Sequence, residues 1–329
     1  MMPIVQVSPD WEIGPDMSAP EFHALQGPSK RPWGHAMFDE IHNKMGIKGQ
    51  GSAIAVIDDG CELNHENFTD SNGDSRIIYH ESFVPGERSD TGGTHGTHVA
   101  GTAGGRFTGV APESKLIILK GLNRNGSGSS QDLAKCYGRL AEMQQDGKID
   151  CPIVVSNGSF GGPSFYAPQE NALEDCESAL ISNVVAAGNA GGSENRPTCG
   201  HPAKSQFAVA VGALNSNWEL SDYSSRCGDR LMIAAPGTNV ISSTVGGRYG
   251  SMSGTSMASP YVAGMQALIN CWLIESGQSV LNTQSEWNEF YKRNATDLGK
   301  PGKDSGTGHG YVDFLELGDW LAKGKLKWV

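Results

Sequence analysis

Short apolar runs alternate with amphipathic segments along most of this chain. The apolar runs are bounded by glycine-rich or polar turns, a pattern typical of buried strands in a parallel sheet. Helical spacing of apolar side chains lies between several of these runs, in residues 130–145 and 168–181. This alternation predicts an α/β fold, namely a three-layer, doubly wound, mostly parallel sheet with helices on both faces. The predicted strands are residues 53–57, 116–119, 153–155, 184–187, 207–211 and 231–234.

A long apolar helix is predicted over residues 257–272, with only loops between it and the last two strands. Ser256 stands in or just before its first turn, directly after Gly254 and Thr255. Backbone N–H groups at a helix start have no partners within the helix, and the helix dipole favours negative charge there. A serine nucleophile and its oxyanion need that environment. For Ser256 taken alone, an ordinary N-cap serine is the alternative.

Two earlier segments supply the groups that would activate such a serine. Asp58 ends the apolar run at 53–57, which places a carboxylate at the carboxyl edge of the predicted sheet, where open α/β sheets carry their active sites. His95 follows a glycine-rich loop at the start of a short helix of small residues, where it can face a cleft. His98, three residues later, is turned into the domain and is predicted to be structural.

The order Asp58, His95, Ser256 and the surrounding residues resemble the subtilisin-like serine proteases, or subtilases. The match is closer to the bacterial and intracellular subtilisins than to the kexins. Five segments in family order leave little room for coincidence. They are residues 56–60 (VIDDG), 95–101 (HGTHVAG), 159–162 (SFGG), 186–189 (AAGN) and 254–260 (GTSMASP).

The resemblance implies a serine endopeptidase in which each residue has a defined role. Ser256 would attack the peptide carbonyl, His95 would take its proton, and Asp58 would orient the imidazole and stay ionised. Asn189, after a buried strand and a glycine turn, would be the oxyanion-hole donor together with the backbone N–H of Ser256. The alternative is a catalytically silent relative that binds peptides, but none of the triad residues is missing. An α/β-hydrolase esterase is disfavoured because its triad follows a different order.

Small-residue segments beside the expected cleft can pair with an extended polypeptide substrate as an added strand. By the same resemblance they are Gly126, Ser127 and Gly128 on one side and Ser159, Phe160 and Gly161 on the other. The walls of the primary specificity pocket are expected to be Gly161, Ala186, Ala187, Gly188 and Gly200. Asp59 gives the Asp-Asp-Gly sequence of the kexin branch, where the second aspartate helps to select a basic substrate residue. A basic preference is therefore a hypothesis for this chain.

The expected chemistry requires no cofactor, but the sequence leaves open whether the protein binds structural calcium. The segment after His95 is too short for the calcium-binding insertion of many subtilases. Asp70, Asn72 and Asp74 offer oxygen ligands at alternate positions, as at the start of a calcium loop. A plain polar turn is the alternative, since no glutamate closes the loop.

Charge and composition limit the classes of binding partner and the cellular location expected for this chain. The net charge of −11 and the lack of a basic stripe weigh against nucleic acid and anionic membranes, and no apolar run is long enough for a membrane span. The first residues lack a secretory signal, so the expected location is cytoplasmic if Met1 is the native start, and secreted if a leader was removed. The seven cysteines have no metal-ligand spacing, and Cys199 and Cys227 could pair in an oxidising compartment.

Residues 1–33 are expected to be an extension or short leader to a peptidase domain at 34–329. Between Pro3 and Trp33 the segment holds six prolines and shows neither a helical nor a strand period, which is typical of an extended or mobile segment. Intracellular subtilases use a short leader that blocks the cleft. Our hypothesis is that this stretch lies near or across the site and is removed on activation, the alternative being a surface strap.

Overall fold

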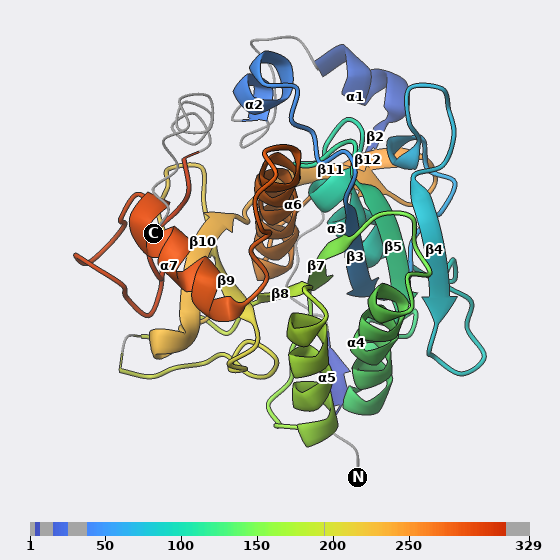
Figure 1. The fold of residues 1–329 in the computed structure, drawn as a ribbon. Helices are drawn as coiled ribbons and strands as arrows, with labels where there is room; N and C mark the ends of the chain where they lie inside the picture. The colour runs from blue at the N-terminus through green and yellow to red at the C-terminus, as the bar shows by residue number, and fades with distance from the viewer. Residues whose placement is uncertain (1–3, 7–15, 26–37, 194, 314–329) are drawn as a thin grey trace.

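A parallel sheet of seven strands forms the centre of the computed structural model, which describes residues 4–6, 16–25, 38–193 and 195–313 (Figure 1). Neighbouring strands in this sheet are parallel, and most of their positions are buried, which explains the apolar runs in the sequence. In spatial order the strands are β10 (Leu231–Pro236), β9 (Val209–Leu214), β8 (Ser182–Ala186), β7 (Ile153–Gly158), β3 (Ala53–Asp58), β5 (Lys115–Lys120) and β4 (Ile77–Ser82).

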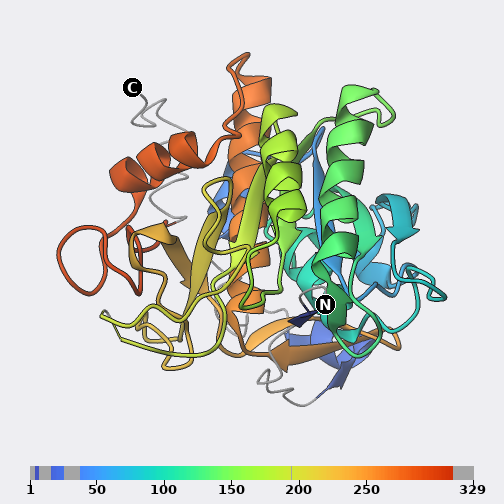
Figure 2. The same cartoon turned by 90° about the horizontal axis from the view of Figure 1, so that it is seen from below.

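Helices cover both faces of this sheet, as predicted. Residues Ile54 and Val56 of β3 pack in the core that includes α3 (Thr94–Gly104) and α6 (Thr255–Glu275). The alternate residues Ala55 and Ile57 pack in the core beneath α4 (Ser130–Gln145) and α5 (Ala167–Ser178), which lie side by side in Figures 1 and 2. The three-layer, doubly wound α/β prediction is confirmed.

The direction of chain winding changes beside β3. Strand β5 pairs with β3 on one side and β7 pairs with it on the other, so β3 lies where the strand order reverses. Asp58 is the last residue of β3, paired in register with Lys120 at the end of β5. The carboxyl edge at such a reversal is where open α/β sheets bind ligands.

The prediction of loops alone between the last core strand and the long helix is wrong. Strands β11 (Val240–Thr244) and β12 (Arg248–Met252) form an antiparallel hairpin there. Their serines and glycines do not form an apolar run, so periodicity missed them. Strand β4 was missed as well, since its burial alternates at the edge of the sheet.

The sequence predicts an extended or mobile segment between residues 3 and 33, but residues 4–6 and 17–18 form paired strands and residues 19–25 form a helix. Strand β2 (Met17–Ser18) pairs with β12, and helix α1 (Ala19–Leu25) follows it. The Phe22 ring stacks on Tyr249 of β12 with centroids 3.9 Å apart, and both side chains are buried. This docking, rather than a local pattern, orders the segment. The predicted boundary at residues 33 and 34 lies outside the described residues.

The remaining elements complete the described chain. Among the residues that the structure describes, no helix has the length and apolarity needed to cross a membrane.

All seven cysteines are free thiols, and a hydrogen bond from the Cys199 N–H to the Arg226 carbonyl brings the segment of Cys199 next to that of Cys227. The other elements are β1 (Ile4–Gln6), α2 (Asp39–Lys44), β6 (Ser127–Ser129), α7 (Gln284–Asn294) and the 3-10 turns Glu66–Phe68 and Gly228–Arg230.

Candidate active site

Asp58 and His95 meet at the carboxyl edge of the sheet. Strand β3 delivers Asp58, and His95 is the second residue of α3. The His95 Nδ1 donates to Asp58 Oδ1 at 2.8 Å, and both side chains are buried. Burial by itself lowers the pKa of His95, but the charge of Asp58, its hydrogen bond and the charge of Asp59 together raise that pKa above its ordinary value. A proton on Nδ1 leaves Nε2 as the basic nitrogen of the neutral ring.

Asp59 is directed into the protein. Its Oδ1 accepts a hydrogen bond from the Gly96 N–H at 2.8 Å, and the residue is only 4% exposed. Burial, followed by the charge of Asp58, raises the pKa of Asp59 from 3.8 to about 6. The Lys120 ammonium donates to the backbone oxygen of Asp59. This geometry fastens the end of β3 to the start of α3, and the basic-preference hypothesis stays a prediction.

Ser256 occupies the first turn of α6. The helix starts at Thr255 after Gly254, whose φ of 156° is a conformation that glycine adopts readily. The Ser256 Oγ donates to the Ser159 backbone oxygen at 3.3 Å. Since Pro260 lacks an N–H, the Ser256 carbonyl has no helical donor four residues later. Instead, the Ser159 hydroxyl donates a hydrogen bond to the Ser256 carbonyl oxygen at 2.9 Å.

Asn189 follows β8 and is held by one end of its amide. Its Oδ1 accepts hydrogen bonds from both the backbone N–H and the hydroxyl of Thr255, each at 2.9 Å. Because both donors require an oxygen acceptor, the opposite end of the amide is the NH₂ group. The Thr255 Oγ1 also accepts the Gly188 N–H at 3.0 Å. Sequence reasoning missed this role of Thr255, although its position beside Ser256 was a signal.

A pocket of about 550 Å³ opens beside Ser256 and Asn189. Small side chains form most of its wall, and a Cβ at Gly200 would collide with the Gly162 carbonyl oxygen, so glycine is required there. The pocket includes every predicted wall residue and the whole of the second predicted edge: Ser159, Phe160, Gly161, Ala186, Ala187, Gly188 and Gly200. Sequence reasoning missed other lining residues, among them Cys199, His201, Lys204 and Ser225.

The first segment predicted to pair with substrate, residues 126–128, lies in and just before strand β6 and does not line this pocket. Ser127 and Gly128 belong to β6, and Gly126 precedes it with a positive φ of 71°. The chain's own strand β1 pairs antiparallel with β6. The register places Val5 opposite Gly128 and Gln6 opposite Ser127. A backbone edge expected to hold substrate is therefore occupied from within the chain.

The candidate calcium residues form a tight turn. The Asp70 Oδ1 accepts the backbone N–H groups of Asn72 and Asp74 at 2.8 and 3.0 Å. These hydrogen bonds lower the pKa of Asp70. The described residues contain no cluster of three or more His, Cys, Asp or Glu side chains suited to a metal. Calcium binding by these residues stays a prediction.

The fold and comparisons with known proteins place the chain in a class. It belongs to the subtilase family, the subtilisin-like serine proteases, whose family model matches residues 49–310. The chain is 38% identical to subtilisin DY of Bacillus licheniformis over 230 residues, which cover 68% of this chain and 78% of that protein. It is 32% identical over 296 residues to the major intracellular serine protease of Bacillus subtilis (strain 168), with 84% and 85% covered. Identity to the intracellular serine protease of Paenibacillus polymyxa is also 32%, over 280 residues.

Proposed function

We propose that this chain is a serine endopeptidase that cleaves polypeptides through an acyl-enzyme formed on Ser256. The observation that carries the proposal is the 2.8 Å hydrogen bond from His95 to Asp58 at the sheet edge that also carries the Ser256 pocket. In the proposed mechanism the Ser256 hydroxyl turns from the Ser159 carbonyl toward Nε2 of His95 and gives it the proton while Oγ attacks the peptide carbonyl. Asp58 stabilises the resulting imidazolium.

The oxyanion would be held by the Ser256 N–H and the NH₂ group of Asn189. The anchored oxygen of Asn189 supports this assignment, because a donor fixed before reaction stabilises the transition state without reorganisation. The proton on His95 then passes to the leaving amine as the C–N bond breaks. Water, deprotonated by the same imidazole, hydrolyses the ester and frees Ser256.

A fluorophosphonate probe followed by peptide mapping tests this proposal. We expect the label on Ser256 in the wild type and no label in Ser256→Ala or His95→Ala. Ser276→Ala is a matched control, since Ser276 is exposed at the end of α6 and should leave labelling unchanged. A folded wild type that neither reacts nor cleaves casein after removal of its N-terminal residues would instead favour a silent peptide-binding relative.

We infer further that the N-terminal segment blocks the site until it is removed. Strand β1 uses the β6 edge that an extended substrate would use, and this antiparallel pairing supports the inference. Intact-mass measurement of the wild type and Ser256→Ala provides the test. An active wild type with a shortened N-terminus, beside a full-length Ser256→Ala, supports self-removal; identical termini in an active preparation would contradict it.

We also propose an intracellular place of action. Two relatives aligned over more than 80% of their length are named intracellular serine proteases. Fractionation of the native host, with antibody detection, should find the protein inside the cell.

A further inference from the structure

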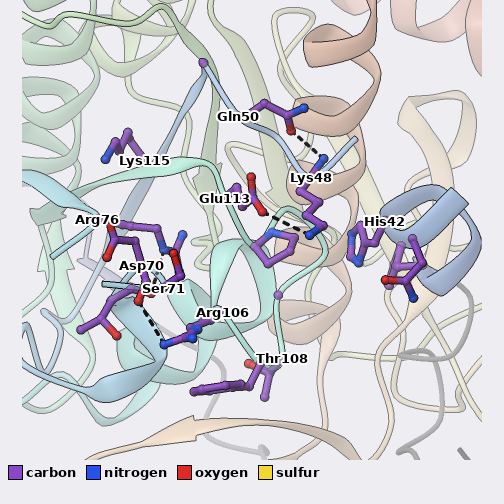
Figure 3. A pocket seen from close by; sticks show the side chains of 17 residues that line it. His42, Lys48, Gln50, Asp70, Ser71, Arg76, Arg106, Thr108, Glu113 and Lys115 are labelled. Carbon is purple, nitrogen blue, oxygen red and sulfur yellow. Dashed lines mark hydrogen bonds and ion pairs between the residues drawn. The ribbon is translucent and has the colours of Figure 1, made fainter. Parts of the chain in front are cut away.

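A second pocket, of about 650 Å³, lies beside the amino ends of β3 and β5, opposite the end of the sheet that carries Asp58 (Figure 3). Its walls come from α2, the turn before β4, the connection from α3 to β5, and Lys115 at the start of β5. Lys115 of β5 pairs in register with Ala53 of β3, and Asp58 lies five residues after Ala53 in β3. At about 3.3 Å per residue, the pocket lies roughly 16 Å from the Asp58 end of β3.

The pocket is basic in an acidic protein. Two carboxylates, Asp70 and Glu113, belong to its lining. Among the described residues of the lining, the basic side chains are Lys48, Arg76, Arg106 and Lys115. These described side chains therefore have two more positive than negative charges, while the whole chain has a net charge of −11.

Both carboxylates already have partners that satisfy part of their charge. Glu113 forms an ion pair with Lys48 at 3.3 Å. Asp70 accepts the two backbone N–H groups of its own turn. Neither carboxylate makes an ion pair with Arg76, Arg106 or Lys115 among the described residues.

Arg76 carries a buried positive charge without a carboxylate in contact in the described part of the chain. The residue is 2% exposed, and burial lowers its pKa to about 10. Its guanidinium is held by dipoles alone, donating to the backbone oxygens of Thr69, Ser114, Asn67 and Gly104. These hydrogen bonds use four of the five guanidinium N–H groups, so Arg76 would stabilise an anion in the adjoining pocket mainly through its positive charge.

Arg106 and Lys115 add donors at the same pocket. Arg106 is exposed; its Nη1 donates to the Asp70 backbone oxygen at 3.0 Å, and its guanidinium carbon lies 5.1 Å from the Phe107 ring centroid. No ion pair engages the Lys115 ammonium in the described residues. Figure 3 shows Arg76 and Arg106 on one side of the pocket, with Lys48 and His42 on the other.

We propose that this pocket binds a small anion that carries a phosphoryl group. The guanidinium of Arg106 matches the oxygens of phosphate in geometry, and lysine adds charge without a fixed direction. The cavity is larger than one phosphate ion, so its natural occupant is a phosphorylated small molecule or a short polyphosphate. This site is distinct from the peptidase site and does not depend on the proposed function.

Titration calorimetry with inorganic pyrophosphate tests the site, with full-length Ser256→Ala used to prevent self-cleavage. We expect saturable binding at constant ionic strength. Adding Arg106→Gln and Lys115→Gln together should weaken binding at least tenfold. Arg88→Gln with Lys135→Gln is the matched control, because it removes two charges outside the pocket and should change affinity less than twofold.

Other outcomes would overturn the proposal. These are no binding at millimolar pyrophosphate, equal losses in the two double variants, or equal competition by chloride and by orthophosphate at matched ionic strength. Circular dichroism verifies the fold of each variant. If the pocket double variant does not fold, Arg106→Gln and Lys115→Gln are measured singly, and each should weaken binding at least threefold.

Discussion

Asp59 accepts the backbone N–H of Gly96, and this hydrogen bond joins the end of β3 to the first turn of α3 beside His95. A carboxylate is favourable at that position because the N-terminal end of a helix carries partial positive charge. The residue that the sequence offered as a selector of basic substrates thus joins two elements next to the imidazole, and we expect it to act as a positioning residue for His95.

The two roles of Asp59 are separable by profiling cleavage of a peptide library. If Asp59 positions His95, Asp59→Thr should lower kcat/KM by a similar factor for all peptides, while Asp59→Asn, which keeps an oxygen acceptor, should lower it less. A selective loss of basic peptides in both variants would instead support direct substrate contact. The 4% exposure of Asp59 favours the first result.

The activity of the enzyme should rise with pH as His95 loses its proton. Because its pKa is raised in the folded protein, the midpoint of kcat/KM should lie above the ordinary value of about 6.5. Asp59→Asn removes a negative charge that raises this pKa, so its midpoint should move to lower pH. A flat wild-type profile between pH 5 and 8 would count against His95 as the base.

Asn189→Ala should lower kcat by about 100- to 1000-fold with little change in KM, because the donor acts on the oxyanion rather than on the bound substrate. Asn217→Ala, on an exposed turn, is the control and should be neutral. Steady-state kinetics with a chromogenic peptide gives both parameters. A loss confined to KM would show that Asn189 serves substrate binding instead.

The hydroxyl of Ser159 and the missing N–H of Pro260 should be coupled energetically. Ser159→Ala leaves the Ser256 carbonyl without its donor, which should cost about 1–3 kcal/mol of unfolding free energy. Pro260→Ala supplies a helical N–H for that carbonyl, so Ser159→Ala should cost less in its presence. Urea unfolding of the four proteins of this cycle, in a Ser256→Ala background, measures the coupling. Additive costs would show that the two residues act separately.

Chelation tests the calcium hypothesis. The Asp70 turn is closed by backbone N–H groups, and Arg106 donates to the backbone oxygen of Asp70, which places a positive charge beside it. We therefore expect EDTA to leave the melting temperature unchanged. A fall in melting temperature that calcium restores, and that Asp70→Asn with Asp74→Asn abolishes, would establish a site there.

The catalytic candidates were predictable because local pattern and chemistry agree at each one. Asp58 ends a buried apolar strand, and Ser256 begins an apolar helix, so strand and helix spacing place them without reference to the rest of the chain. Both lie at the carboxyl edge of the parallel sheet, Asp58 at the end of β3 and Ser256 in the pocket with the residues that follow β8.

The supporting contacts depend on tertiary structure and leave little trace in the sequence. Ser159 reaches the Ser256 carbonyl from a position 97 residues away, and no periodicity connects them. The burial of Asp59 depends on how α3 packs on β3. Helix α1 is likewise ordered by the stacking of Phe22 on Tyr249, so local propensity could not reveal it.

Strand β1 and the β6 edge that it covers belong to one chain. Under the proposed inhibition, a substrate would compete with a tethered strand whose effective concentration is in the millimolar range for a short flexible linker. Cutting that tether leaves the three-residue pairing unchanged but makes it bimolecular. Under the same proposal, the released segment would then dilute away, and a single cleavage would act as a one-way switch.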